Sequence, residues 1–146
     1  MFCITAKTDR DNGFISNTAI QVANEPLRLL ISVQQGNLTR EMIEESGIFN
    51  VSVLTENVPY DTIRHFGMQS GRDTDKFDDF LSVARTDNGL LYLTENTNAV
   101  FSCEVKEKIP LGSHTVFIGE VKEAKVLSDI PSCTYAHYHQ SIKPKK

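Results

Sequence analysis

Tryptophan is absent from this chain of 146 residues, and cysteine occurs only three times. Aromatic stacking against a ligand therefore falls to phenylalanine, tyrosine or histidine. The odd number and wide spacing of Cys3, Cys103 and Cys133 favour free thiols in a reducing cytoplasm over disulfides. Cys103 falls on the apolar side of an alternating stretch, where a thiol behaves as a small apolar side chain.

Long apolar runs are also missing, and none approaches the roughly 18 residues that a membrane-spanning helix needs. Met1-Phe2-Cys3-Ile4 is apolar but lacks the basic leader and long apolar core of a signal peptide. The net charge of -4 argues against nucleic acid as the main partner, because such binding rests on a basic surface. With 40% apolar and 23% charged residues, the chain predicts a single globular domain over residues 1–146.

Several familiar enzyme motifs are absent as well. The chain has no G-x-G-x-x-G after a strand, no P-loop, no C-x-x-C and no G-x-S-x-G. These absences argue against a Rossmann nucleotide site, a redox dithiol, a zinc ribbon and a hydrolase nucleophile. Cys133, His137 and His139 are three metal-ligand types near the end of the chain. Three such residues without a fourth partner seldom form a site, so we expect no metal.

What the sequence does contain is a succession of short β-type segments. Residues 2–7 predict a strand, and the Asn12-Gly13 pair predicts a hairpin turn before a second strand over 14–22. Asn24-Glu25-Pro26 then turns the chain. The nearly continuous apolar run over 27–33 is typical of a strand buried on both faces.

A helix is predicted next. Thr39 is the predicted cap, Glu41 lies in the first turn and Gly47 ends the helix. Leu38 and Ile43 stand at the positions of a hydrophobic staple.

Further along, the pattern predicts a strand over 48–54, a short helix over 59–66 closed by Gly67, and a helical turn around Phe77, Phe80 and Leu81. The clearest alternation comes late, where Phe101, Cys103 and Val105 alternate with polar residues and predict a half-buried strand.

A break over 110–113 and a returning strand over 114–126 complete a hairpin with that alternating strand. The total is about six strands with short helices between them. Antiparallel strands in such numbers tend to close into a barrel or a sandwich, so the predicted fold is mostly β.

Small polar residues gather at four strand-to-loop junctions, which are residues 16–19, 34–39, 70–77 and 112–114. The second junction enters a helix, whose free N–H groups and dipole suit a phosphate, and Thr39 either adds a hydroxyl or only caps. In the third, Arg72 and Lys76 either meet a phosphate or balance neighbouring aspartates in a solvated loop. His114, in the fourth, either contacts a cofactor or is merely exposed.

The order and spacing of these junctions resemble the flavin reductase-like, FMN-binding split-barrel family over almost the whole chain. Matching stretches are residues 17–26, 37–39, 46–54, 66–72, 99–105 and 112–121. The tail over 134–139 resembles the subgroup of flavoredoxins and of flavin domains attached to rubredoxin. The resemblance implies a six-stranded antiparallel Greek-key split barrel with short helices, forming homodimers that hold FMN in a groove near the dimer interface.

The resemblance also implies roles for individual residues. Asn17, Thr18 and Ala19 would contact the isoalloxazine ring. The implied phosphate residues are Asn37 and Thr39, helped by Ser70, Gly71, Arg72 and Lys76. Gln35 lies in the same region, at a position where near relatives tend to have lysine. One positive charge that could bind the phosphate is therefore missing. His114 falls in a Gly-Asp-His stretch linked to nicotinamide binding, and Ser113 here replaces the acidic residue.

The function implied by the resemblance is that of an FMN-binding oxidoreductase, a flavin reductase that takes electrons from NADH or NADPH. FAD is the less favoured flavin, and no side-chain acid or base is required for hydride transfer. One alternative is a flavoredoxin-like carrier reduced by a rubredoxin-like or other redox protein. Another is a non-catalytic flavin-binding domain. Relatives usually begin with a short helix before the first strand, and without it we expect a weaker dimer or a more open pocket.

Overall fold

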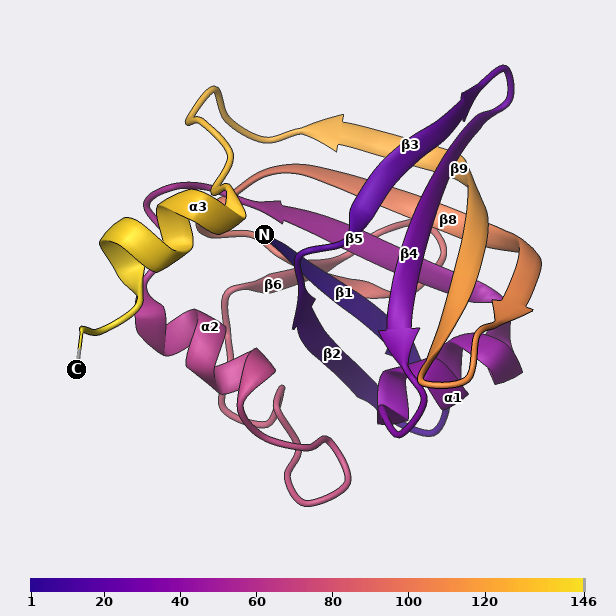
Figure 1. Ribbon diagram of the computed structural model, residues 1–146, viewed down its shortest axis with the longest axis horizontal. Coiled ribbons are helices and arrows are strands. Elements are labelled where there is room, and N and C mark those ends of the chain that lie inside the picture. Colours follow the sequence, from indigo (N-terminus) through magenta and orange to yellow (C-terminus); the bar gives the residue numbers. More distant parts are fainter. Residues whose placement is uncertain (146) are drawn as a thin grey trace.

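The computed structural model describes residues 1–145 as one long antiparallel sheet that curls on itself, with short helices packed against it (Figure 1). Its strand order is β2-β1-β5-β8-β9-β4-β3. The strands are β1 (Phe2–Lys7), β2 (Asp11–Ser16), β3 (Ala19–Asn24), β4 (Leu27–Gln34), β5 (Ile48–Leu54), β8 (Thr97–Pro110) and β9 (His114–Val126). A separate hairpin is formed by β6 (Val83–Arg85) and β7 (Leu91–Leu93).

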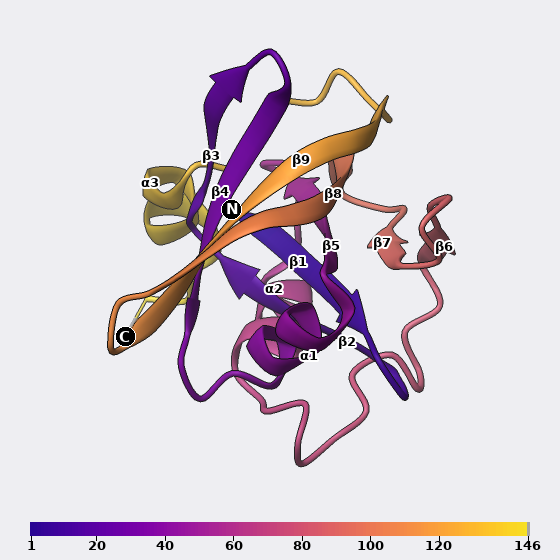
Figure 2. The same cartoon turned by 90° about the vertical axis from the view of Figure 1, so that its right-hand side faces the viewer.

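The helices are short, and the first of them contributes Met42 and Ile43 to the core inside the curled sheet, whereas the second packs on the outside (Figure 2). They are α1 (Leu38–Ser46), α2 (Tyr60–Gly67), α3 (Tyr135–His137) and a π-helical turn over Tyr138–Ile142. No helix within residues 1–145 is long and apolar enough to span a bilayer.

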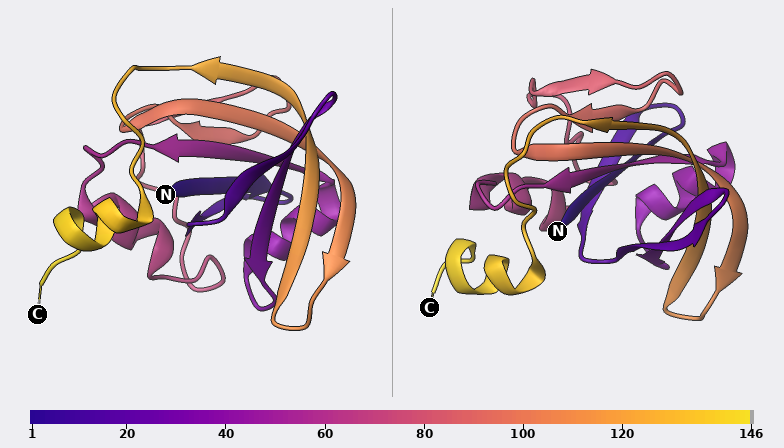
Figure 3. Two further views of the ribbon diagram at one scale, coloured as in Figure 1. Left: turned by 45° about the horizontal axis from the view of Figure 1, so that its top comes forward. Right: turned by 90° about the horizontal axis from the view of Figure 1, so that it is seen from above.

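The curl of the sheet follows from its connectivity. The edge strands β2 and β3 are joined by only Asn17 and Thr18. In a flat sheet of this size the edges would lie about 29 Å apart, from six interstrand spacings. The link from Ser16 to Ala19 spans at most about 11 Å. The sheet must therefore roll until its edges meet at this link, which we call the seam (Figure 3).

The mostly β architecture predicted from the sequence is confirmed, with seven strands in the main sheet in place of six. The extra strand arises because residues 14–22, predicted as one strand, are divided between β2 and β3 at the seam. The predicted strand over 48–54, the predicted strand over 114–126 and the turn at Glu25-Pro26 are all confirmed.

The first hairpin turns earlier than predicted. Asn12 and Gly13 lie inside β2, opposite Ala6 and Thr5, and the turn is at residues 8–10. The reason lies in tertiary contacts, because the buried Asn12 side chain donates a hydrogen bond to Thr39 Oγ1 at 3.0 Å. Where burial and a local turn preference conflict, burial sets the register of the sheet.

Strand β4 is buried on one face, and the prediction of burial on both faces is wrong. Leu29, Ile31 and Val33 point into the core, while Leu30 and Ser32 are half-buried on the other face. That second face takes part in the site described below.

The N-cap of helix α1 lies two residues before the predicted cap. Asn37 is the N-cap, because its Oδ1 accepts a hydrogen bond from the Thr39 N–H at 2.8 Å. Thr39 is therefore a buried residue of the first turn, and the predicted staple does not apply. Glu41 in the first turn and the end at Gly47, whose φ is 74°, are confirmed.

The predicted helical turn around Phe77 and Phe80 is not formed. The rings of both residues pack on Phe66, at centroid distances of 5.1 and 5.0 Å, and Leu81 is exposed. Packing of these rings on Phe66 fixes this segment in place of helical hydrogen bonds. The predicted short helix over 59–66 is confirmed as α2, within one residue at each end.

Two cores flank β1. Ile4 and Ala6 face the barrel interior, where Phe49 and Phe117 are fully buried. Cys3 faces the outer core with α2 and the C-terminal segment.

All three cysteines are free and buried, as predicted for reduced thiols. Burial raises the pKa of Cys3 and of Cys103 to about 12, so both remain protonated and serve as small apolar side chains.

Candidate functional site

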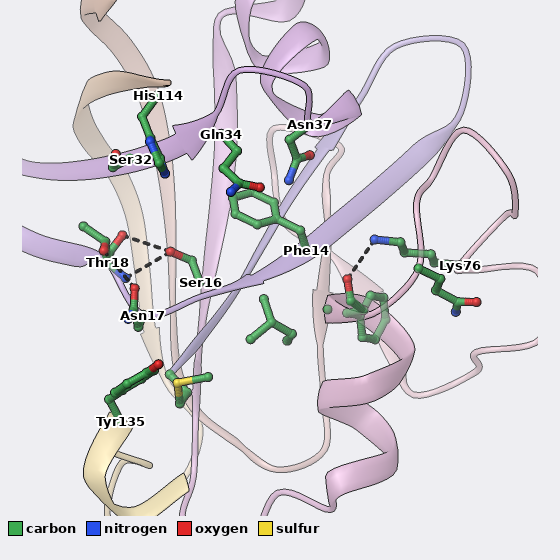
Figure 4. A pocket seen from close by; sticks show the side chains of 15 residues that line it. Phe14, Ser16, Asn17, Thr18, Ser32, Gln34, Asn37, Lys76, His114 and Tyr135 are labelled. Atoms are coloured by element: carbon green, nitrogen blue, oxygen red, sulfur yellow. Dashed lines mark hydrogen bonds between the residues drawn. The ribbon is translucent and has the colours of Figure 1, made fainter. Parts of the chain in front are cut away.

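A groove of about 360 Å³ opens at the seam, where β2 gives way to β3 (Figure 4). Its walls come from the end of β2, the seam link, β4, the start of β9, α2 and the C-terminal segment. The lining residues are Met1, Phe14, Ile15, Ser16, Asn17, Thr18, Ser32, Gln34, Asn37, Phe66, Gly67, Gln69, Lys76, His114 and Tyr135. Phe14 and Phe66 are buried and form an apolar floor.

The groove continues into a second cavity of about 500 Å³ toward the N-terminus of α1. The two cavities share five lining residues, which are Gln34, Asn37, Gly67, Gln69 and Lys76. Ser70 and Gly71 line only the second cavity. Together the cavities make one elongated site with two chemically different ends.

We call the first end the seam end, defined by Asn17, Thr18 and His114. Thr18 donates from its hydroxyl to Asn17 Oδ1 at 3.0 Å and from its N–H to Ser16 Oγ at 3.0 Å. His114 opens β9 opposite Gln34, and its Nδ1 lies 2.9 Å from Ser113 Oγ. This end offers amide, hydroxyl and imidazole groups beside an apolar floor, which suits a flat heterocyclic ring.

We call the other end the helix end, defined by Asn37, Ser70, Gly71 and Lys76. Asn37 starts α1, and the first turn of a helix presents N–H groups and a partial positive charge to an anion. A Cβ on Gly71 would lie 2.4–2.6 Å from the Asn12 side chain, so only glycine lets the loop approach this closely.

Lys76 places a buried cation beside the helix end. It is 3% exposed, and its Nζ donates to the Gly13 and Phe66 carbonyls, both at 2.8 Å. Burial lowers the pKa of Lys76. An ammonium group has three N–H donors, so one donor remains after these two bonds.

Arg72 lies next to the helix end without lining the cavity. Its guanidinium donates to Glu41 Oε1 at 2.7 Å and to the Gly36 carbonyl at 3.3 Å. The pair raises the pKa of Arg72 and lowers the pKa of Glu41. The charge of Arg72 is therefore largely balanced within the protein.

Besides Arg72, three of the predicted site residues line neither cavity. Ala19 is half-buried at the start of β3, and Thr39 is buried beneath Asn37. Gln35 turns its side chain to accept a hydrogen bond from Thr115 Oγ1 at 3.1 Å. Seven of the predicted residues border the two cavities, namely Asn17, Thr18, Asn37, Ser70, Gly71, Lys76 and His114.

Sequence reasoning missed several lining residues. Ser32 lies two residues before Gln34, the first residue of the predicted junction over 34–39, and its alternation with the buried residues of β4 is a sequence signal for this position. Gln69 comes just after α2 and Tyr135 begins α3, and neither carries such a signal. Within residues 1–145, no group of three or more His, Cys, Asp or Glu side chains is placed to hold a metal.

Comparison with known proteins identifies the family of this chain. A profile of the flavin reductase like domain matches residues 1–145. The chain belongs to the flavin reductase-like family. It is therefore a flavin-binding oxidoreductase domain of the flavin reductase type, with the groove as its candidate site.

Two curated relatives of this flavin reductase-like domain are similar in sequence. The high molecular weight rubredoxin of Moorella thermoacetica is 38% identical over 141 residues, which cover 96% of this chain and 61% of that protein. The ferric-chelate reductase (NAD(P)H) of Archaeoglobus fulgidus is 32% identical over 146 residues, covering 99% of this chain and 86% of that protein. The chain thus spans only about three fifths of the rubredoxin relative.

A solved structure supports the fold. The NADH:FAD oxidoreductase of Streptomyces globisporus superposes with a TM-score of 0.79 at 23% identity, over 90% of this chain and 77% of that one. At this identity the likeness concerns the fold alone.

Proposed function

We propose that this domain is a flavin reductase that holds FMN in the groove and reduces it with NADH or NADPH. The observation that carries the proposal is the elongated groove at the seam, with a polar end, an apolar floor and a cationic helix end. A flavin mononucleotide has a matching order of parts, which are a flat ring system, a polar ribityl chain and a terminal phosphate.

The groove residues fit such a ligand. Asn17 and Thr18 would meet the ring, with Phe14 and Phe66 beneath it. Asn37 and the α1 N-terminus would hold the phosphate with Lys76, whose burial strengthens any bond to an anion.

Bound FMN would supply the redox chemistry, accepting a hydride, that is one proton and two electrons, from the reduced nicotinamide. The protein's part is to orient the ring and to keep water from its buried face. His114 stands at the rim of the seam end, where a nicotinamide donor would enter.

A second candidate function is that of an electron carrier reduced by a protein partner. The 38% identity to a rubredoxin supports it, as does Ser113 beside His114 in place of an acidic residue. In this function a redox protein, not NAD(P)H, would deliver electrons to the same groove.

An absorbance spectrum of the protein with added FMN, before and after anaerobic NADH or NADPH, tests both candidates. Retained flavin that is bleached by either nucleotide supports the reductase. Retained flavin that stays oxidised until reduced rubredoxin is added supports the carrier. Failure to retain FMN at micromolar concentration contradicts both.

The phosphate placement has its own test. Arg72→Ala should weaken FMN binding by about threefold to tenfold and leave riboflavin binding unchanged, because only FMN presents a phosphate. The effect is modest because Glu41 already pairs with Arg72. Fluorescence titration with both ligands measures it. Arg64→Ala, an exposed arginine paired with Asp61, is the matched control. An equal loss for both ligands would contradict this placement.

We also propose that the domain works as a homodimer in which the partner chain completes the groove. Strand β3 is a sheet edge, and Ile20 and Val22 on it are 55% and 43% exposed. Exposed apolar edges favour pairing with another chain. Light scattering should give twice the chain mass for the FMN-loaded protein, and a loaded monomer would refute the proposal.

A further inference from the structure

Tyr135 is an exposed aromatic residue held between two buried anchors. Cys133 is 1% exposed, and its N–H donates to the Leu54 carbonyl at 2.7 Å. Tyr138 is 7% exposed and packs in the outer core with Phe66. Between these anchors Tyr135 is 50% exposed, yet it lines the groove. The C-terminal segment thus carries one aromatic side chain to the site and fixes its backbone on both sides.

The side chain of Tyr135 is also supported laterally. His139 packs against its ring at a centroid distance of 4.4 Å and an angle of 69°. The short helix is capped by Thr134 Oγ1, which accepts from the His137 N–H at 3.0 Å. His137 Nε2 lies 3.2 Å from the Glu56 carbonyl, which ties the segment to the loop after β5. These contacts restrict the ring although no core surrounds it.

The position of Tyr135 within the site is informative. Figure 4 places it on the same side as Asn17, Thr18 and His114, and opposite Lys76. Phe14 and Phe66 are buried at the floor, whereas Tyr135 and His114 are accessible at the rim. A planar ligand lying on the floor would expose its outer face between these two rim residues.

We propose that Tyr135 is a specificity-determining residue that forms the aromatic wall of the donor subsite and packs against the nicotinamide ring of NAD(P)H. The proposal rests on the reductase function proposed above. Aromatic side chains gain affinity for flat heterocycles through stacked or edge-on contact, and they lose little conformational freedom when pre-positioned. His114 lines the same groove and adds a polar contact beside this wall.

Steady-state kinetics of the FMN-loaded protein test the proposal. Tyr135→Ala should raise the KM for NADH by about tenfold, in line with the stacking of a base on an aromatic ring. The Kd for FMN should change by less than about twofold, because the ring of Tyr135 would contact the nicotinamide and not the flavin. Tyr135→Phe should keep the wild-type KM. Tyr92→Ala, a half-buried tyrosine of β7 beneath Lys125 and outside the groove, is the matched control.

The outcomes separate this proposal from the reductase proposal. If NADH reduces the wild-type flavin and Tyr135→Ala leaves the KM unchanged, the donor wall is refuted and the reductase stands. If Tyr135→Ala weakens FMN binding as strongly as it raises the KM for NADH, Tyr135 contributes to flavin binding. That result refutes the proposed contact with the nicotinamide. If the wild-type protein retains FMN but neither reacts with NADH nor binds NAD⁺ by calorimetry, both proposals are refuted.

Discussion

Replacing Phe66 with alanine should lower the free energy of unfolding by about 3–5 kcal/mol, the usual cost of removing a fully buried phenyl ring. Phe66 is 0% exposed and anchors the rings of Phe77 and Phe80. The same residue forms the groove floor, and its carbonyl accepts a hydrogen bond from Lys76. Its loss should therefore loosen the loop over 68–82 and weaken FMN binding by at least about tenfold. Urea unfolding and fluorescence titration measure the two effects.

Phe49→Ala is the matched control, because Phe49 is equally buried but lies in the barrel interior, outside the groove. It should lower the unfolding free energy by a similar amount and leave the FMN affinity nearly unchanged. Phe66→Leu keeps most of the volume and allows the binding measurement if the alanine variant does not fold. Equal FMN affinities for Phe66→Leu, Phe49→Ala and wild type would contradict the role of Phe66 in the site.

Lys76→Met should weaken FMN binding by about 10-fold to 100-fold, because a charge-assisted hydrogen bond contributes about 1.5–3 kcal/mol. Riboflavin, which has no phosphate, should bind nearly as well as to the wild type. The methionine also leaves the Gly13 and Phe66 carbonyls without their donor, so unfolding should be followed in parallel. Lys108→Met, at an exposed lysine of β8, is the control for net charge. An equal loss for FMN and riboflavin would place the phosphate elsewhere.

The same side chain predicts a pH dependence. Burial lowers the pKa of Lys76, so its ammonium loses its proton at a lower pH than an ordinary lysine does. The charge that favours FMN is present below this pKa and is lost as the pH rises through it. FMN affinity should therefore fall on the alkaline side while riboflavin affinity follows only the flavin's own titration. In Lys76→Met the difference between the two ligands should no longer vary with pH.

Local patterns were sufficient for many elements of the fold. Strands β1 and β9 have the bounds that the sequence predicts, and α1 ends at Gly47 as predicted. These elements follow from signals carried by neighbouring residues, which are alternation of period two and a glycine able to adopt a positive φ. The family resemblance rested on the order of several such segments, and the match over residues 1–145 confirms it.

Contacts between distant residues decided where local signals failed. Asn12-Gly13 favours a turn locally, but Asn12 is buried against Thr39, and this contact moves the turn to residues 8–10. The predicted strand over 14–22 is divided at Asn17, because the chain there leaves one edge of the sheet and enters the other. No pattern within a short window reports such a crossing.

The candidate site likewise depends partly on local sequence and partly on contacts between distant residues. Residue type and order along the chain predicted that polar residues at the strand ends would belong to one site, and Asn17, Asn37 and His114 do line one groove. Only the tertiary structure decided that Lys76 is a buried cation, that Arg72 pairs with Glu41, and that Tyr135 reaches the rim from the far end of the chain. The physical reason is that burial, charge pairing and access depend on which distant surfaces meet when the sheet closes, whereas the sequence by itself specifies the strands, the caps and the chemistry they carry.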